Sequence, residues 1–158
     1  MDISTNAGGT VWTCPNRPNF PQYDPAGVQF IIGYQYFGGV TKWLNPAGTF
    51  TSRSPIKLGN SKPGWCLAAD AVMKIDGGWG VSTSPYFQGM PPHRLSGNLP
   101  AGGNEVFTDG SASWCKFQTM HYLTTWNTDG SRIAYFYQDQ SDFDSSLVSV
   151  LGALAAKY

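Results

Sequence analysis

Apolar and polar residues follow each other along this chain in short runs that glycine and proline interrupt. The runs 28–40 and 65–72 are the strongest strand predictions, because their β-branched and aromatic residues suit the pleated surface of a sheet. Gly33 interrupts the first run. The second run is apolar at nearly every position, so we expect it near the centre of a sheet. Residues 132–138, RIAYFYQ, predict a further strand.

A hairpin is predicted around Asp109 and Gly110, which lie between the runs 105–108 and 111–117. An Asp-Gly pair in this setting favours a type I′ turn, in which both central residues have positive φ. Glycine adopts such angles without steric cost, and an aspartate carboxylate accepts hydrogen bonds from nearby backbone N–H groups. Asp109 is therefore predicted to be a turn residue and not a catalytic carboxylate.

The C-terminal residues 145–158 show the period of a helix and not that of a strand. Apolar residues from Leu147 to Leu154 recur three and four positions apart and form one stripe, and Asp144 or Ser145 can cap the helix. Such a stripe normally packs against the rest of its own domain, so we expect a C-terminal helix lying on the sheet.

Two irregular segments complete the pattern. Closely spaced prolines exclude a helix in residues 1–27, and residues 76–100 form a long loop rich in Gly, Pro and Ser. The predicted fold class is α+β: a single domain dominated by an antiparallel sheet with long loops. Its globular β-rich body is expected to span residues 1–144, with residues 145–158 as a C-terminal helix packed on it.

Composition supports this class and narrows the function. The chain has 158 residues, enough for one domain with a real core, and its 19 Gly, 11 Pro and many aromatics suit turns joining short strands. The formal net charge is zero, 13% of residues are charged, and no basic stripe is present. Nucleic acid is therefore not an expected partner. No apolar stretch is long enough to predict a transmembrane helix.

A hydrolase is the first catalytic hypothesis. The histidines are His93 and His121, and Cys115 precedes His121 by six positions. Cysteine–histidine catalysis requires a spatial pair, and the sequence has no nucleophile motif such as GxSxG. Structural roles are therefore expected for both histidines, and the protein is not expected to be an enzyme.

Calcium is the one metal that the residue pattern suggests. Asp139, Asp142 and Asp144 lie close together in one loop, and converging carboxylate oxygens suit Ca²⁺, although the EF-hand pattern is absent. The alternative is that Asp142 and Asp144 cap the following helix, whose dipole favours negative charge there. Both interpretations stay open, and no other cofactor is indicated.

The cysteines and tryptophans leave further alternatives. Cys14, Cys66 and Cys115 include no CxxC pair, so zinc is not indicated. They are either buried thiols or one disulfide and a free thiol, and Cys66–Cys115 is then the preferred pair because both lie in strand-like runs beside a Trp. The six tryptophans are dispersed along the chain, which suits a core or the stacking platforms of a non-catalytic carbohydrate-binding module.

Residues 91–117, PPHRLSGNLPAGGNEVFTDGSASWCKF, resemble the C-terminal signature of prepilin-type, pseudopilin-like proteins known from planctomycetes and verrucomicrobia. The matching positions are His93, Gly102, Gly103, Asn104, Asp109, Gly110 and Trp114. The segments 12–15, 67–70 and 132–139 match further motifs in the same order, so the resemblance covers about residues 11–142. The commonest form of the motif has its histidine about ten positions before Asp-Gly, where this chain has Leu99.

The resemblance implies assembly and not catalysis. Pilin-like subunits pack their N-terminal helices into a filament core while α+β headgroups form the outer wall, and this chain is then expected to be a headgroup without that helix. Its implied role is structural, in a type IV pilus or a type II secretion-like pseudopilus, with other pilin or pseudopilin subunits as partners through the missing helix. The implied location is extracellular or periplasmic, and the isolated headgroup is expected to be soluble and monomeric. Related secretion pseudopilins bind calcium in a C-terminal acidic loop, which favours the calcium interpretation of Asp139, Asp142 and Asp144.

Overall fold

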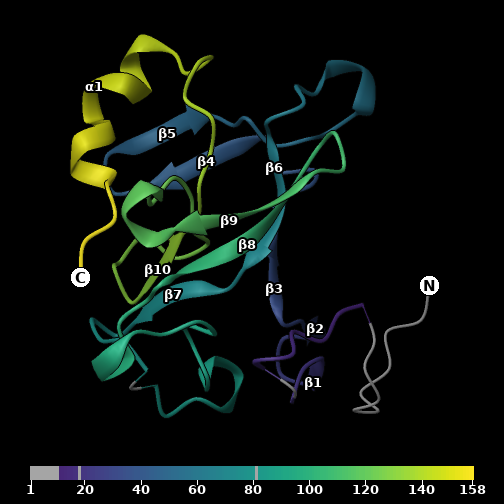
Figure 1. Ribbon diagram of the computed structural model, residues 1–158, viewed down its shortest axis with the longest axis vertical. Helices are drawn as coiled ribbons and strands as arrows, with labels where there is room; N and C mark the ends of the chain where they lie inside the picture. The colour runs from purple at the N-terminus through teal and green to yellow at the C-terminus, as the bar shows by residue number, and fades with distance from the viewer. Residues whose placement is uncertain (1–10, 18, 81) are drawn as a thin grey trace.

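Antiparallel strands make up most of the regular secondary structure in this computed structural model, which describes residues 11–17, 19–80 and 82–158 (Figure 1). In chain order the strands are β1 (Gln22–Asp24), β2 (Gln29–Ile31), β3 (Tyr34–Tyr36), β4 (Lys42–Asn45), β5 (Gly48–Thr51), β6 (Cys66–Asp70), β7 (Val72–Ile75), β8 (Gly102–Phe107), β9 (Ala112–Lys116) and β10 (Arg132–Tyr135). Helix α1 (Ser145–Leu154) follows them. The predicted α+β class, a single domain with mostly antiparallel sheet and a C-terminal helix, is confirmed.

The largest sheet has the strand order β3-β6-β8-β9, and all neighbouring pairs are antiparallel. β6 lies between β3 and β8, as predicted for the apolar run 65–72. After Ala71 the chain continues into β7, which leaves this sheet and pairs with β10. The hairpin β4–β5 and the pair β1–β2 are further two-stranded sheets.

Gly33 divides the predicted strand 28–40 into β2 and β3. Its backbone N–H donates to the carbonyl of Trp12 at 3.1 Å, and a Cβ at this position would lie 2.7 Å from the backbone nitrogen of Cys14. A side chain larger than hydrogen therefore does not fit where residues 12–14 cross the chain.

The hairpin β8–β9 forms where the Asp-Gly pair predicts it, but its turn is of another type. Phe107 N–H donates to Ser111 O at 2.9 Å and Gly110 N–H donates to Phe107 O at 3.0 Å, so the loop has three residues, 108–110. Only Gly110 of this pair has a positive φ, +84°, whereas a type I′ turn requires two such residues. Asp109 Oδ1 accepts a hydrogen bond from Ser111 N at 2.9 Å, as expected of a turn residue.

Substituting Gly110 with alanine is expected to lower the free energy of unfolding by about 1 kcal/mol, because alanine is strained at positive φ. Asp109→Ala is expected to lower it as well, by removing the acceptor for Ser111 N–H. Urea unfolding monitored by tryptophan fluorescence measures both effects. Unfolding midpoints identical to that of the unmodified protein would contradict this account of the turn.

The main core lies between the four-stranded sheet, the β4–β5 hairpin and α1, which Figure 1 shows alongside that hairpin. Its fully buried side chains include Trp43, Phe117, Leu123, Phe136 and Leu147. A smaller cluster of Ala71, Met73, Ile75, Met90 and Ala134 packs around β7 and β10. The aromatic residues that suggested strands therefore supply much of the core.

Helix α1 has the predicted cap and the predicted buried stripe. Asp144 Oδ1 accepts from Leu147 N at 3.0 Å, which satisfies one of the free N–H groups of the first turn. Leu147 and Leu154 are buried in the main core. The helix ends at Leu154, earlier than Tyr158, because Ala155 pairs with His121 in an isolated β-bridge.

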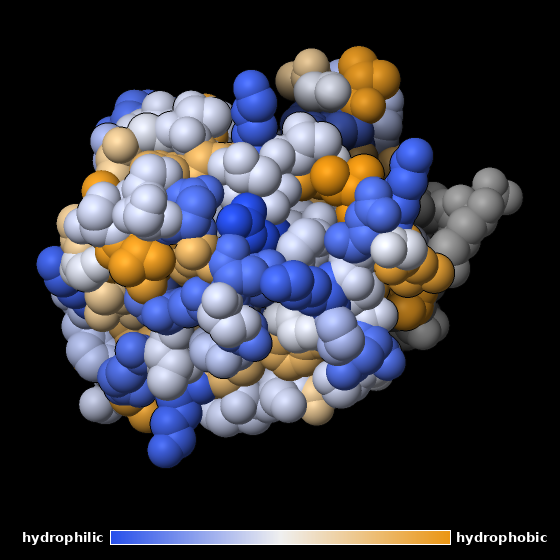
Figure 2. All heavy atoms as spheres, turned by 90° about the horizontal axis from the view of Figure 1, so that it is seen from above, coloured by the Kyte–Doolittle hydropathy of each residue, from blue (hydrophilic) through white to orange (hydrophobic). Residues whose placement is uncertain are grey.

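Hydrophilic and hydrophobic side chains are mixed on the surface shown in Figure 2. Figure 2 shows one face with hydrophilic side chains across its middle and hydrophobic ones in smaller patches nearer the edges. This face therefore lacks one continuous apolar surface. Within the described residues, no helix combines the length and the apolar character needed to cross a lipid bilayer.

The predicted Cys66–Cys115 disulfide is not formed, because both are free thiols, as is Cys14. Cys66 lies in β6 and Cys115 in β9, and β8 runs between them. Two strand spacings amount to about 9–10 Å, beyond the roughly 7 Å between Cα atoms that a disulfide spans. The strand-like surroundings of both residues were predicted correctly, but sequence alone does not show that a third strand separates them.

Candidate functional site

Asp70, the last residue of β6, organises a cluster of polar side chains that is the best candidate site in the molecule. Its side chain is buried, and Oδ2 accepts hydrogen bonds from the backbone N–H of Asn104 at 2.7 Å and from its side-chain amide at 3.0 Å. The same oxygen lies 3.0 Å from His93 Nε2. One carboxylate oxygen therefore joins β6 to β8 and to the long loop 76–100.

His93 is held by hydrogen bonds on both ring nitrogens. Nε2 faces Asp70, and Nδ1 lies 3.0 Å from the side-chain amide nitrogen of Asn16. With the Asn16 amide donating to Nδ1, the hydrogen on Nε2 faces the Asp70 carboxylate. Trp114 packs edge-on against the imidazole, with ring centroids 5.0 Å apart and an interplanar angle of 86°. Two positions of the signature, His93 and Trp114, are thus in direct contact.

The two glycines of the signature allow the strands to approach closely. Gly102 has φ +149°, and a Cβ there would overlap the carbonyl oxygen of Cys115 on β9. A Cβ on Gly103 would lie 3.0 Å from Cβ of Asp70 and 3.2 Å from a methyl group of Val72. Gly-Gly-Asn therefore brings the Asn104 amides up to Asp70, where a larger residue would push β8 away.

A hollow of about 500 Å³ opens beside this cluster, and Cys14, Asp70, His93 and Asn104 line it. The Cys14 thiol points to Asp70 Oδ1, at 3.8 Å. Burial raises the pKa of this thiol above its usual value. A thiol becomes a nucleophile as a thiolate, so Cys14 is held in its unreactive form. The hollow contains the parts of a cysteine–histidine pair, but the imidazole is bonded to Asp70 and Asn16 instead.

The second histidine of the hydrolase hypothesis has a structural position. His121 pairs through its backbone with Phe136 and Ala155, and burial lowers the pKa of its side chain. Burial also raises the pKa of Cys115 to about 12, so this thiol stays protonated at neutral pH. Neither Cys14 nor Cys115 is thus poised as a nucleophile.

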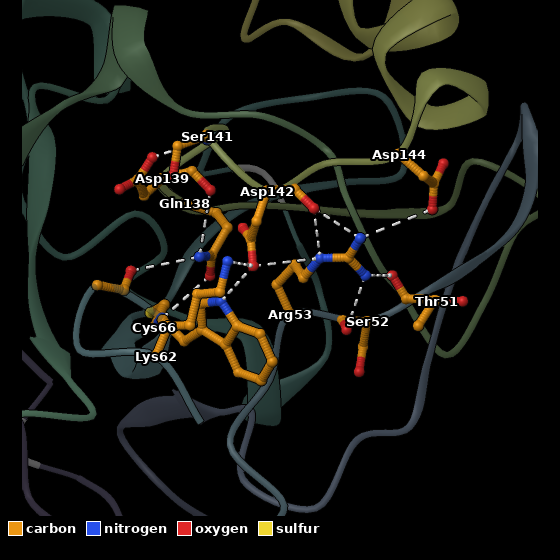
Figure 3. Close-up of polar contacts among 12 residues, drawn as sticks. Thr51, Ser52, Arg53, Lys62, Cys66, Gln138, Asp139, Ser141, Asp142 and Asp144 are labelled. Atoms are coloured by element: carbon orange, nitrogen blue, oxygen red, sulfur yellow. Dashed lines mark hydrogen bonds and ion pairs between the residues drawn. The ribbon is translucent and has the colours of Figure 1, made fainter. Parts of the chain in front are cut away.

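The three aspartates of the calcium hypothesis have protein partners (Figure 3). Asp142 Oδ2 accepts from Trp65 Nε1 at 3.0 Å and lies 3.2 Å from Lys62 Nζ and 3.5 Å from Arg53 Nε. Arg53 also donates two hydrogen bonds to the backbone carbonyl of Asp142, at 2.9 and 2.7 Å. The Asp142 carboxylate is therefore already neutralised.

Asp144 caps α1, and Asp139 Oδ1 accepts from Ser141 N at 2.8 Å. The described part of the chain contains no group of three His, Cys, Asp or Glu side chains arranged to hold a metal. The capping interpretation of Asp144 is confirmed, whereas Asp142 holds Arg53 and Lys62. Calcium at Asp139, Asp142 and Asp144 stays a prediction that would require these contacts to rearrange.

The tryptophans do not form one exposed platform. Trp43 and Trp79 are buried, Trp12 and Trp65 are half-buried, and Trp114 and Trp126 are exposed. Trp114 covers His93, whereas Trp126 lines a different hollow around Phe30 and Met73. The clustered indoles that would favour a glycan-binding face are therefore not seen.

Some residues of the site carry a sequence signal and others do not. The resemblance pointed to His93, Gly102, Gly103, Asn104 and Trp114, and its further segments include Cys14 and Asp70. Asp70 also stands out as a charged residue at the end of an otherwise apolar strand. Asn16 has no such signal, because nothing in its surroundings marks it as a partner of a histidine 77 positions away.

Comparisons of the chain with models of protein families, with curated proteins and with solved structures gave no match.

Proposed function

We propose that this chain is the globular part of a pilin-like filament subunit, of a type IV pilus or a type II secretion-like pseudopilus, with an assembly role and no catalytic one. The order of motifs over residues 11–142 supports this family assignment. The proposal places the domain outside the cytoplasm, on the outer wall of a filament, with further copies or related subunits as partners.

One observation carries the non-catalytic part of the proposal: the signature residues are used to hold the fold together. Asp70 accepts from both amides of Asn104 and faces His93, and His93 is held in turn by Asn16 and covered by Trp114. Asp70 is the buried member of this cluster, and a buried carboxylate whose hydrogen bonds are satisfied in this way rigidifies a fold and helps to specify its strand register. Such rigidity suits a subunit that must present the same surface at every position of an assembly.

The cysteine–histidine alternative is less well supported. A nucleophilic thiol requires a lowered pKa and a base within hydrogen-bond reach. The pKa values of Cys14 and Cys115 are instead raised by burial, and the Cys14 thiol points to a carboxylate.

The direct test is to locate the protein in the organism that encodes it. Antibodies raised against the purified domain are expected to label surface filaments in immunogold electron microscopy and to detect the chain in filaments sheared from cells. Deleting the gene should remove both signals. Complementation with Lys57→Met, a substitution at an exposed position, should restore them, whereas Gly102→Ala, which disturbs β8 against β9, should not. Labelling confined to the cell interior, or filaments unchanged by the deletion, would refute the proposal.

A further inference from the structure

A second and larger hollow lies next to the Asp70 cluster, and we call it the Arg17 groove. Its volume is about 700 Å³, within the range of sites for small organic ligands. Segments from β2, β3, β4, β7 and β10 form its walls, and it shares Ile32, Tyr34 and Tyr36 with the hollow at Asp70. The filament proposal assigns no role to this groove.

The walls of the Arg17 groove are mostly apolar, including Phe30, Phe37, Leu44, Met73, Phe87 and Met90. Its charged residues are Arg17, Lys42 and Arg132, and no Asp or Glu is among the residues that line it. The whole chain has a formal net charge of zero, so the composition does not indicate the local excess of positive charge in this groove. An apolar groove with cations alone is complementary to an apolar anion.

Arg17 is the residue that most requires a ligand. It is 2% exposed, its Nη2 donates to the carbonyl of Tyr86 at 3.1 Å, and its guanidinium lies 3.8 Å above the ring of Phe20. Its Nε and Nη1 are buried without a hydrogen-bond partner among the described residues. Burial lowers its pKa to about 10, so the side chain is still a cation at neutral pH. A buried cation without an anion is costly, and a bound carboxylate removes that cost.

The other two cations occupy different positions. Arg132 lies 4.7 Å from the ring centroid of Phe87 and 5.9 Å from that of Trp126, so aromatic faces already attract its charge. Lys42 is exposed. Arg17 is therefore the one deeply buried cation of the groove, which matches a single negative charge on the ligand.

We propose that the Arg17 groove binds an apolar monocarboxylic acid, such as a medium-chain fatty acid, with its carboxylate on Arg17 Nε and Nη1 and its chain along the apolar walls. A carboxylate accepts hydrogen bonds from a guanidinium at the same time as it neutralises the charge. A phosphate dianion fits less well, because it would bring a second charge into walls that are mainly apolar.

The test uses dodecanoate as the probe. Dodecanol, which has the same chain length but no charge, is the control ligand. Isothermal titration calorimetry is expected to show dodecanoate bound at one site and dodecanol bound at least tenfold more weakly. Arg17→Met keeps the length of the side chain without its charge, and is expected to weaken dodecanoate binding at least tenfold and to leave dodecanol unaffected. Lys57→Met, which removes an exposed cation outside the groove, is the control and should bind dodecanoate normally.

A second measurement keeps the test decisive if Arg17→Met does not fold. Dodecanoate brominated at its last carbon is expected to quench the fluorescence of Trp126, which lines the groove, and Trp126→Phe should remove that part of the quenching. Equal binding of dodecanoate and dodecanol, quenching unchanged in Trp126→Phe, or no binding would overturn the proposal. So would a concentration-dependent dimer in sedimentation whose formation prevents dodecanoate binding, because a second copy would then occupy the groove.

Discussion

Replacing Glu105 with glutamine is expected to make the protein more stable than the unmodified chain at pH 8.5, and to remove most of the fall in stability between pH 4.5 and 8. Glu105 is the only glutamate of the sequence and is completely buried in β8. Its Oε1 accepts from Tyr137 N at 2.7 Å, while Oε2 has no partner among the described residues.

Stability falls with rising pH because the folded and the unfolded protein bind different numbers of protons over this range. Burial, with a smaller contribution from the nearby Asp70 charge, raises the pKa of Glu105 from 4.5 to about 8. Below pH 4.5 the Glu105 carboxyl is neutral in both the folded and the unfolded state, so its ionisation does not lower the free energy of unfolding. Between pH 4.5 and 8 the unfolded chain ionises while the folded chain does not, so stability is lost as pH rises. A difference of this size corresponds to about 5 kcal/mol over the whole window.

Two measurements check this prediction. Glutamate labelled with ¹³C at its carboxyl carbon gives a single side-chain NMR signal, which is expected to titrate near pH 8. Urea unfolding of both proteins across pH 4–9 should then give free energies that diverge in favour of Glu105→Gln as pH rises. His121, whose pKa is lowered by burial, changes stability in the opposite direction but equally in both proteins. A glutamate signal that titrates near pH 4.5 would disprove the account.

Removing the carboxylate of Asp70 is expected to lower the free energy of unfolding by about 3–5 kcal/mol. Asp70→Ala leaves the backbone N–H of Asn104 without its acceptor. It also removes the hydrogen-bond partner of the Asn104 side-chain amide and of His93. Asp70→Asn keeps one oxygen acceptor, so its loss should be smaller.

The measurement is urea unfolding, combined with hydrogen exchange of the Asn104 amide. In Asp70→Ala this amide should exchange much faster, relative to the central amides of β6, than in the unmodified protein. Lys57→Met, at an exposed position outside the cluster, is the control and should change neither quantity. A loss below 1 kcal/mol for Asp70→Ala would show that the cluster does not stabilise the fold.

The sequence predicted elements where a local pattern was strong. The apolar run 65–72 became the central strand β6, and the stripe from Leu147 to Leu154 became a capped helix. The hairpin β4–β5 was not predicted from the sequence. Its strands have four residues each, too few to show an alternating pattern, and buried Trp43 and the bond from Asn45 Nδ2 to Leu123 O hold it in place.

The Asp70 cluster and the Arg17 groove could be predicted less well, because tertiary contacts bring their residues together. Motif order singled out His93 and Asn104, but their meeting at Asp70 follows from the packing of a loop against two strands. Arg17 and Glu105 had no signal of their own as charged residues. The alternation of buried and exposed residues in β8 does place Glu105 in the interior, because Gly103 and Phe107, two positions away on either side, are buried. Arg17 lies in a proline-rich segment without periodicity, where no pattern indicates burial.

The three buried thiols have a consequence for where this domain can function. All are free, and burial raises the pKa of each, so the thiolate that reacts with oxidants and other disulfides is scarce while the fold is intact. With β8 between Cys66 and Cys115, those two cannot join without unfolding. The covalent structure of the domain is therefore expected to be the same in a reducing and in an oxidising environment.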